Sequence, residues 1–401
     1  MPSSAGPSAA EPDNVNMVEQ MGVDEVAAGF ERVYGFQPAG VWAAPGRVNL
    51  IGEHVDYNGG IMLPFAIDRD IRLAARLRDD GVFRAASAQG KGTVEVALDD
   101  VAAGTVQGWL AYPAGVARYV RDLGGAGGAD IFISGDIPGG SGLSSSAALL
   151  CATAVAMVDL GGVEIDALSL ALLCQRAENV VVGVPSGMMD QTASMMSTAG
   201  HALMIDAQGP RVEQVPFDPA AEGLTVTVLV TNVVHKLADG QYAERRAACE
   251  KAASILGVAT LREVVGLPLG EIEAKLRDAV LFKRTRHVVT EIERTLKAVE
   301  LLRAGDLLAV APLISESHVS LRDDYEVSCA ELDAAVDAAL SVGALGARMI
   351  GGGFGGSAIA IVPVARVGAV DEAVHTAFAE RGFRAPAVFD ALPAPGARRI
   401  T

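Results

Sequence analysis

The sequence predicts an α+β protein with two lobes and a ligand cleft between them. Segments with the periods of strands and of helices are mixed along all 401 residues, with no internal repeat and no coiled-coil heptads. At roughly 100–200 residues per domain, this length allows two or three domains. The composition turns to Pro, Gly and acidic residues around Gly209–Glu222, which indicates a boundary there. Long strands with inserted helices suggest two α+β layers that face each other across a cleft.

The chain is expected to divide into a leader and two domains. Residues 1–19 consist mainly of small residues, Pro and acids, which predicts a disordered leader. This leader has neither the basic nor the apolar region of a signal peptide. We expect an N-terminal domain at 20–212 and a C-terminal domain at 213–401.

The N-terminal domain is expected to begin with an amphipathic helix from about Val23 to Tyr34. Val26, Phe30 and Val33 lie at i, i+4 and i+7, on one helical face. The further expected elements are strands at Gly40–Ala44, Gly60–Ala66, Ile71–Arg78 and Ile131–Ile133, and helices at Ser144–Val158, Asp166–Val181 (N-capped by Asp166) and Met188–Met196.

The C-terminal domain is expected to open with a strongly apolar strand and to close with another. The expected elements are strands at Leu224–Thr231 and Ser357–Val362 and long helices at Tyr242–Leu256 and Arg284–Ala304.

The charge and cysteine content exclude several classes of protein. A formal net charge of −17 argues against binding to nucleic acid or to an anionic membrane surface, since both need clustered Lys and Arg. No run of 18 apolar residues without polar interruption is present. The four cysteines have neither CxxC nor zinc-ligand spacing, so we expect no disulfide framework. This cysteine content fits a protein located in the reducing cytoplasm. We expect a monomer, although the sequence does not exclude an oligomer.

The first chemical motif is GRVNLIGEHVDYNGG, Gly46–Gly60. It gathers an arginine, two carboxylates, an imidazole and an amide between apolar strands. Sugar hydroxyls need both donors and acceptors, which such groups supply. A loop that is polar only because it is solvated is the alternative.

The second motif is PGGSGLSSSAA, Pro138–Ala148, which follows a strand and opens a helix. Backbone N–H groups of such a loop can approach phosphate oxygens, and the helix dipole favours their negative charge. The motif lacks the GK[ST] ending of a Walker loop, so a flexible turn is the alternative. The serines at the helix start favour function, because hydroxyls can cap the helix, bind phosphate or ligate Mg²⁺.

The third motif is GGGFGGS, Gly351–Ser357. Its glycines permit positive φ angles and a close approach of the backbone to a ligand. A loose hairpin is the alternative. Two Gly-rich loops far apart in one chain favour a shared anion site over either loop alone.

Taken in this order, the three motifs resemble those of the GHMP kinases, a family of small-molecule kinases. Gly46–Gly60 resembles the signature of the galactokinase branch, and the resemblance covers about residues 20 to 395. Three further stretches match the same branch: VPSGMMDQ (Val184–Gln191), TNVVHKLADGQY (Thr231–Tyr242) and ESHVSLRDDYEVSC (Glu316–Cys329). The resemblance implies the two-lobed GHMP kinase fold, with the active site between the lobes and a sugar- and phosphate-binding N-terminal domain.

The resemblance also implies the reaction and the residues that carry it. MgATP would donate its γ-phosphoryl group to the C1 hydroxyl of galactose. Asp190 would face this hydroxyl, with Arg47 beside Asp190 and the γ-phosphate. The remaining implied residues are galactose contacts at Glu53, His54, Asp56, Gly187 and Tyr242, a phosphate loop of Gly139, Gly140, Ser141, Gly142, Leu143, Ser144, Ser145 and Ser146, and Mg²⁺ ligands at Ser146 and Glu178. Arg348 and the pair Asp323–Asp324 match the family pattern and are assigned structural roles.

Each of these residues also has a structural alternative. Asp190 could cap its helix, His54 could be a core histidine, Tyr242 an ordinary aromatic at a helix start and Glu178 a solvated acid. The chain departs from the family at four positions: Val55 and Ile350 replace Thr, and Ser186 and Ser357 replace Cys.

The sequence leaves the mechanism and the substrate partly open. Asp190 could accept the hydroxyl proton, or it could only position the sugar while Arg47 stabilises the developing charge. The phosphate loop contains no lysine, so Mg²⁺ and the helix N-terminus must supply most of the positive field. A kinase for N-acetylgalactosamine or L-arabinose, a non-catalytic galactose and ATP sensor, and a GHMP-like kinase outside sugar metabolism are the alternatives.

Overall fold

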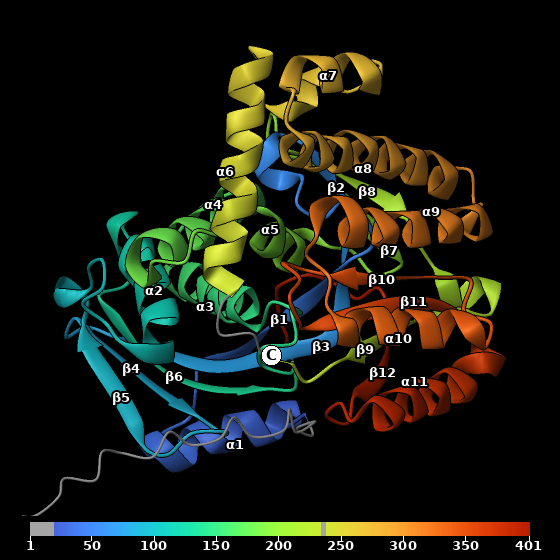
Figure 1. Cartoon of the computed structure of the whole chain (residues 1–401). Coiled ribbons are helices and arrows are strands. Elements are labelled where there is room, and N and C mark those ends of the chain that lie inside the picture. Colours follow the sequence, from blue (N-terminus) through green and yellow to red (C-terminus); the bar gives the residue numbers. More distant parts are fainter. Residues whose placement is uncertain (1–19, 234–237) are drawn as a thin grey trace, which may run out of the picture.

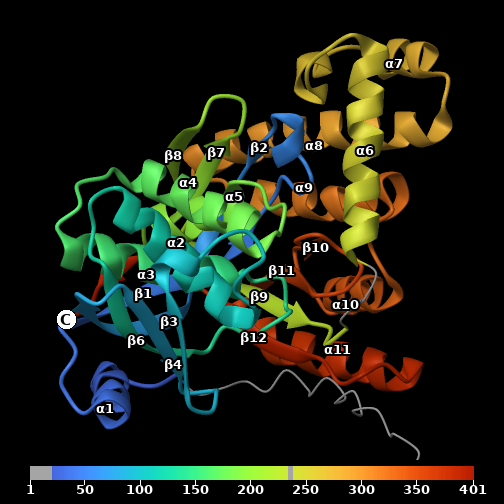
Figure 2. The same ribbon diagram turned by 90° about the vertical axis from the view of Figure 1, so that its left-hand side faces the viewer.

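The computed structural model describes residues 20–233 and 238–401 (Figure 1). The expected leader, and residues 234–237 of the stretch Thr231–Tyr242, lie outside the described residues. Two sheets lie side by side, each covered by helices, and a smaller third sheet lies next to them (Figures 1 and 2).

The first sheet has six strands in the order β13-β1-β3-β6-β4-β5. All neighbours are antiparallel except β4 and β6. Its strands are β1 (Gly40–Asn49), β3 (Pro64–Arg78), β4 (Val82–Ser87), β5 (Thr93–Ala97), β6 (Gly128–Gly135) and β13 (Arg398–Arg399).

Helices cover both faces of the first sheet. Helix α1 (Val23–Tyr34) lies below it in Figure 1 and buries Val26 and Phe30 against Phe132 of β6. Helices α2 (Ala111–Asp122) and α3 (Ser145–Gly161) lie above it. Because α3 is buried along most of its length, its Ala-rich composition suits a position between the sheet and other helices. Helices α4 (Ala167–Ala177) and α5 (Met189–Met196) pack against α3.

The second sheet has the order β10-β11-β9-β12 and is antiparallel throughout. Alternate residues of β11 face opposite sides of the sheet. Ile359 belongs to the same hydrophobic cluster as residues of α9, whereas Ala358 and Ala360 belong to the cluster that includes residues of α10 and α11. The elements are β9 (Leu224–Val230), β10 (Gly346–Ile350), β11 (Ser357–Pro363), β12 (Ala387–Ala391), α9 (Leu307–Ser320), α10 (Ala330–Ser341) and α11 (Val367–Arg381).

The third sheet has the order β2-β7-β8 and lies near helices α6 to α8, which form one end of the molecule in both views. The boundary that we propose after residue 212 falls inside β8, ahead of β9. The elements are β2 (Ile61–Met62), β7 (His201–Asp206), β8 (Arg211–Pro216), α6 (Ala238–Leu256), α7 (Leu269–Leu276) and α8 (Ala279–Arg303).

Most of the elements predicted from the sequence are confirmed, and two predictions need correction. Helix α1 has the predicted bounds and ends at Gly35, which adopts a left-handed conformation (φ 81°). The strands expected at Gly60–Ala66 and Ile71–Arg78 are instead the short β2 followed by one continuous strand, β3. The helix expected to run to Val181 stays α-helical only to Ala177 and continues as a π-helical turn, Glu178–Val182.

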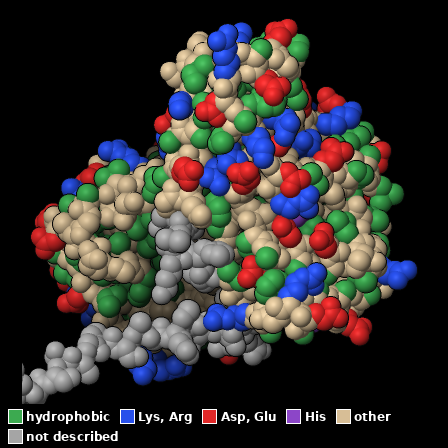
Figure 3. All heavy atoms as spheres, viewed as in Figure 1, with side chains coloured by type: hydrophobic (Ala, Val, Ile, Leu, Met, Phe, Trp, Pro, Cys, Tyr) green, Lys and Arg blue, Asp and Glu red, His purple; other side chains and the backbone are tan. Residues whose placement is uncertain are grey.

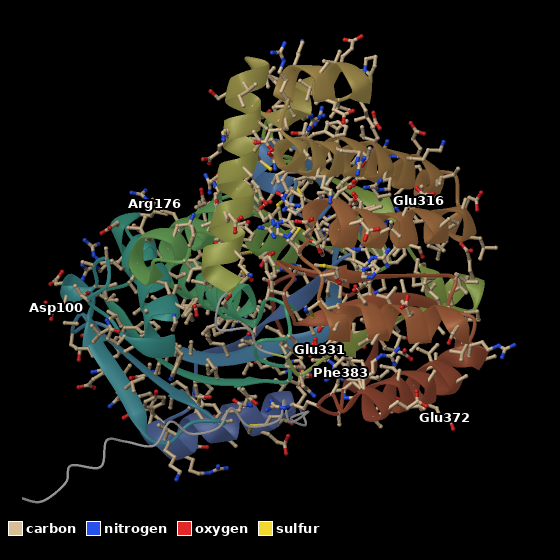
Figure 4. All side chains as sticks on the ribbon, viewed as in Figure 1. Asp100, Arg176, Glu316, Glu331, Glu372 and Phe383 are labelled. Atoms are coloured by element: carbon tan, nitrogen blue, oxygen red, sulfur yellow. The ribbon has the colours of Figure 1, made fainter. Side chains whose placement is uncertain are left out.

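The surface shown in Figure 3 carries acidic and basic side chains interspersed with apolar ones. Acidic side chains such as Asp100, Glu316 and Glu372 are exposed and point away from the molecule (Figure 4). No helix in the described ranges is long and apolar enough to span a bilayer.

Candidate active site

A cavity of about 460 Å³ is lined by both halves of the chain. Its walls come from the first motif, from the turn before α5, from the start of α6 and from the third motif. The residues lining it are Arg47, Glu53, His54, Asp56, Gly183, Val184, Pro185, Ser186, Gly187, Met189, Asp190, Tyr242, Gly351, Gly352 and Gly353. The two implied catalytic residues and all five implied galactose contacts therefore lie around one cavity.

Asp190 and Arg47 form an ion pair at the wall of this cavity. The Nε and Nη2 atoms of Arg47 lie 2.8 and 2.7 Å from Oδ1 of Asp190. Arg47 is almost fully buried (5% of its side chain exposed), whereas the Asp190 side chain is 26% exposed. The carboxylate is therefore held firmly but remains accessible from the cavity.

Helix α5 and strand β1 bring this pair together. Asp190 lies in the first turn of α5, where the helix dipole favours a negative charge. The Ser194 hydroxyl of the same helix donates to the Pro45 carbonyl of β1 at 2.7 Å. Since Ser194 is fully buried, this bond fixes the helix against the strand that carries Arg47.

Ser144 provides a contact to Asp190 that the sequence did not reveal. Its hydroxyl donates to Oδ2 of Asp190, so both carboxylate oxygens are held. Ser144 precedes α3 in a left-handed conformation (φ 61°), which costs a non-glycine residue roughly 1–2 kcal/mol. Its hydroxyl makes no cap bond to α3 because it points to Asp190 instead.

The first motif is anchored from the C-terminal half. Oε1 of Glu53 accepts a hydrogen bond from the Gly351 amide at 2.7 Å and lies 2.7 Å from Nη2 of the fully buried Arg348. Arg348 also donates to the Leu50 carbonyl at 3.1 Å, and His287 contacts the Glu53 carbonyl at 3.1 Å. Arg348 thus holds the motif in place, in keeping with the structural role expected for it.

The buried His54 and the half-buried Asp56 lie beside the cavity. Burial, with His287 nearby, lowers the pKa of His54 to about 3, so its imidazole is neutral. Burial, together with the nearby charges of Asp190 and Glu53, raises the pKa of Asp56 to about 6. Tyr242 lies against His54 with ring centroids 5.5 Å apart.

Asp56 lies directly against Gly187, so a side chain at this position would force the Asp56 carboxylate to move. A Cβ at this position would come within 2.0 Å of Oδ2 of Asp56. The residue therefore contributes space to the cavity rather than a side chain.

The two Gly-rich loops contact each other beside the ion pair. Nη1 of Arg47 donates to the Gly142 carbonyl at 2.5 Å, and the Ser357 hydroxyl donates to the Ser141 carbonyl at 2.6 Å. A Cβ on Gly356 would also contact Ser141, at 3.5 Å. The juxtaposition that two distant Gly-rich loops suggested is present.

Comparisons with known proteins agree with this arrangement. The galactokinase galactose-binding signature matches residues 28–77, and the N-terminal and C-terminal domains of the GHMP kinases match residues 111–198 and 298–381. The galactokinase of Streptomyces coelicolor is 50% identical over 374 residues, which cover 92% of this chain and 97% of that one. The chain belongs to the galactokinase family.

Another galactokinase is similar in sequence, and two solved kinase structures are similar in fold. The galactokinase of Chloroflexus aggregans is 44% identical over 350 residues, covering 85% of this chain and 88% of that one. The crystal structure of Lactococcus lactis galactokinase complexed with galactose is similar with a TM-score of 0.87, at 34% identity, over 94% of this chain and 99% of that one. The mevalonate kinase of Methanococcus jannaschii, at 17% identity and a TM-score of 0.59, shares the fold; the matched regions cover 90% of this chain and 98% of that one.

Two of the positions at which this galactokinase-family chain departs from the family pattern make hydrogen bonds near the cavity. Ser186 donates to Oε2 of Glu178 at 2.6 Å, and Ser357 makes the loop contact described above. A hydroxyl is a stronger donor than the thiol usual in the family. Val55 and Ile350 are buried in the core.

Glu178 lies in the π-helical turn after α4, beside the phosphate loop. Its Oε2 also accepts from the Gln191 amide at 2.6 Å, and burial raises its pKa. The Ser146 hydroxyl is close enough to counteract that rise. No group of three or more His, Cys, Asp or Glu residues in the described ranges could hold a metal by itself. Ser146 and Glu178 could therefore hold Mg²⁺ only together with phosphate oxygens or water, which is how Mg²⁺ usually binds.

A second hollow, of about 250 Å³, adjoins the start of the phosphate loop. Ile71, Ile133 and Ile137 give it apolar walls, and Gln89 and Gly139 also line it. No sequence pattern had indicated this hollow, because its residues come from strands β3 and β6 and from the segments that follow β4 and β6.

Proposed function

We propose that this chain transfers the γ-phosphoryl group of MgATP to the C1 hydroxyl of galactose, giving galactose 1-phosphate and ADP. The observation that carries the proposal is the Arg47–Asp190 ion pair, which lies between a cavity with several polar side chains in its wall and two touching Gly-rich loops. The cavity suits a sugar, and the loops suit phosphates. The reacting groups would meet at Asp190.

Galactose is proposed to occupy the 460 Å³ cavity. Glu53 and Asp56 offer acceptors to its hydroxyls, and His54 and Tyr242 offer groups that can donate. Gly187 keeps the cavity wide enough beside Asp56. Such a mixture of donors and acceptors suits a ligand whose hydroxyls need both.

ATP is proposed to extend its phosphates along Gly139–Ser146, with its base in the 250 Å³ hollow beside Gly139. The N-terminus of α3 points toward this loop, and its dipole stabilises anions there. Ser146 and Glu178 would hold Mg²⁺, which neutralises charge on the phosphates when bound.

In the proposed reaction, the C1 oxygen forms a bond to the γ-phosphorus while the bond from that phosphorus to the β,γ-bridging oxygen breaks. The hydroxyl proton passes to Asp190, and ADP leaves with the electrons of the broken bond. Arg47 stabilises negative charge that develops on the transferred group. Because the transition state of phosphoryl transfer is loose, the proton should move late, after most of the bond to ADP has broken.

A coupled assay of ADP release tests this function. MgATP is offered with galactose, glucose, N-acetylgalactosamine or L-arabinose, with the Asp190→Ala variant as control. Turnover of galactose alone, abolished in Asp190→Ala, supports the proposal. Turnover of another sugar in place of galactose would identify a kinase of different selectivity, and galactose binding without turnover would indicate a sensor.

We also propose that the protein works as a monomer in the reducing cytoplasm. All four cysteines are free thiols, which supports a reducing compartment. A molar mass near that of one chain, 41.3 kDa, in light scattering is the expected result for a monomer.

A further inference from the structure

A chain of hydrogen-bonding side chains runs from His54 into the protein, away from the cavity. Nδ1 of His54 lies 2.9 Å from the Tyr57 hydroxyl, which lies 2.7 Å from the hydroxyl of Tyr325. The Tyr325 hydroxyl in turn lies 3.2 Å from Sγ of Cys249. Tyr57 belongs to a 3₁₀ turn, Tyr325 to the π-helical turn after α9 and Cys249 to α6, so three separate elements build the chain.

All four groups are neutral at physiological pH. Burial raises the pKa values of Tyr57 and Tyr325 well above their ordinary range and also raises that of Cys249. Burial lowers the pKa of His54. Each hydroxyl therefore carries one proton and can donate once, and the imidazole has one donor and one acceptor nitrogen.

The protons of this chain can point in two directions. Toward His54, Cys249 donates to Tyr325, Tyr325 donates to Tyr57 and Tyr57 donates to Nδ1, which leaves the imidazole proton on Nε2. In the opposite direction, Nδ1–H donates to Tyr57 and the last hydroxyl donates to sulfur, a weak acceptor.

The far end of the chain favours the first direction. A thiol sulfur is a weak acceptor, so the Tyr325 hydroxyl, 3.2 Å from Sγ of Cys249, donates better to the Tyr57 hydroxyl at 2.7 Å. Tyr57 then donates to Nδ1 of His54, and the imidazole proton lies on Nε2, which is buried and has no hydrogen-bond partner among residues 20–233 and 238–401.

We propose that Tyr57, Tyr325 and Cys249 are positioning residues that lock His54, which lines the cavity, in its Nε2–H tautomer. The nature of the ligand rests on the proposed function, whereas the tautomer does not. A neutral His54 ring held in one tautomer and one orientation gives this wall of the cavity a fixed shape and a fixed hydrogen-bonding pattern.

The tautomer can be measured without substrate, by ¹⁵N NMR of the full chain with labelled histidine. His54→Asn identifies the His54 resonances. We expect the shift pattern of a protonated Nε2 and a bare Nδ1, and mixing of the two tautomers in Tyr325→Phe. A protonated Nδ1 in the unchanged chain would overturn the proposal, as would shifts that Tyr325→Phe leaves unaltered.

Kinetics provides the second readout. Tyr325→Phe and Tyr57→Phe should raise KM for galactose roughly three- to tenfold, as expected for one weakened hydrogen bond, while KM for MgATP stays nearly constant. Cys249→Ser keeps a donor at the end of the chain and should retain the KM of the unchanged protein.

Tyr34→Phe is the matched control, because it removes a half-buried hydroxyl that donates to the Ile131 carbonyl at 2.8 Å, away from the cavity. An equal rise in galactose KM in Tyr34→Phe would show a general loss of stability and contradict the positioning role. If galactose were not the substrate, the NMR experiment would still test the tautomer of His54, because it uses no substrate.

Discussion

At Asp190 the two carboxylate oxygens have different neighbours, and this asymmetry bears on the mechanism. Oδ1 is paired with Arg47, whereas Oδ2 accepts from the Ser144 hydroxyl. A neutral hydroxyl partner can be exchanged for a sugar hydroxyl more easily than a buried arginine can. Oδ2 is therefore the oxygen expected to meet the C1 hydroxyl.

Replacing Asp190 by Asn separates the two roles considered for this residue. The amide keeps the size of the side chain but cannot take a proton. If Asp190 is the base, kcat should fall by about 10²–10⁴-fold while galactose still binds. Pre-steady-state kinetics and galactose binding by calorimetry make the comparison, and a nearly unchanged kcat would leave Asp190 only a positioning role.

Asp56 should make galactose binding depend on pH. Its pKa is raised to about 6 by burial, so the carboxylate takes up a proton as pH falls through that value. The protonated group loses its charge-assisted hydrogen bond, and KM for galactose should rise about three- to tenfold below pH 6. Steady-state kinetics from pH 5 to pH 8 measures this with Asp56→Asn as the control, whose KM should be higher and nearly flat. A flat profile in the unchanged protein would be the contrary result.

At the scale of single elements, the π-helical turn after α4 places Glu178 beside the phosphate loop. Glu178→Gln removes the charge but keeps the shape and the bonds to Ser186 and Gln191 within reach. If Glu178 holds Mg²⁺, the variant should need at least about tenfold more Mg²⁺ for half-maximal activity, because one charged ligand is lost. An unchanged Mg²⁺ titration would remove Glu178 from the metal site.

The contact between α9 and β10 depends on glycine. A Cβ at Gly346 would lie 2.1 Å from the Ala311 carbonyl oxygen. Gly346→Ala should therefore lower the free energy of unfolding by about 1–3 kcal/mol, as overpacking does. Gly368→Ala in the first turn of α11 is the control, since nothing lies within 4 Å of its added Cβ. Denaturant unfolding of both variants gives the comparison, and equal stabilities would refute the packing argument.

The elements that the sequence predicted well are those whose local pattern agrees with their environment. Helix α1 has one apolar face and a glycine after its last residue. The sequence therefore predicted both the helix and the residue at which it ends. Strand β3 was divided in two because Asp68 and Asp70 interrupt its apolar residues. The Asp70 carboxylate accepts a hydrogen bond from Arg72, and the Asp68 carboxylate accepts one from the Leu392 amide. These side-chain contacts are made while the strand itself continues without a break.

At the scale of the whole molecule, the active site joins segments that no local pattern connects. Arg47 and Asp190 are 143 residues apart, and the sequence implied their meeting only through resemblance to the GHMP kinases. The Ser144 contact and the chain behind His54 were not predicted at all, because they depend on how α3, α5, α6 and the turn after α9 pack around the first motif.

The net charge of −17 is compatible with an anionic co-substrate because positive groups are concentrated where the phosphates are expected. The buried Arg47, the N-terminus of α3 and the two Gly-rich loops meet at one place. The charged side chains on the surface, such as Glu316 and Glu372, point away from the molecule (Figure 4).

The most direct test of the central claim, that Asp190 faces the C1 hydroxyl of galactose bound in the cavity, uses 1-deoxygalactose, which lacks only that hydroxyl. In the coupled ADP-release assay, it should compete with galactose but release no ADP, because the group that receives phosphate is missing. ADP release in step with phosphorylation of 1-deoxygalactose would place a different hydroxyl at Asp190 and contradict the account.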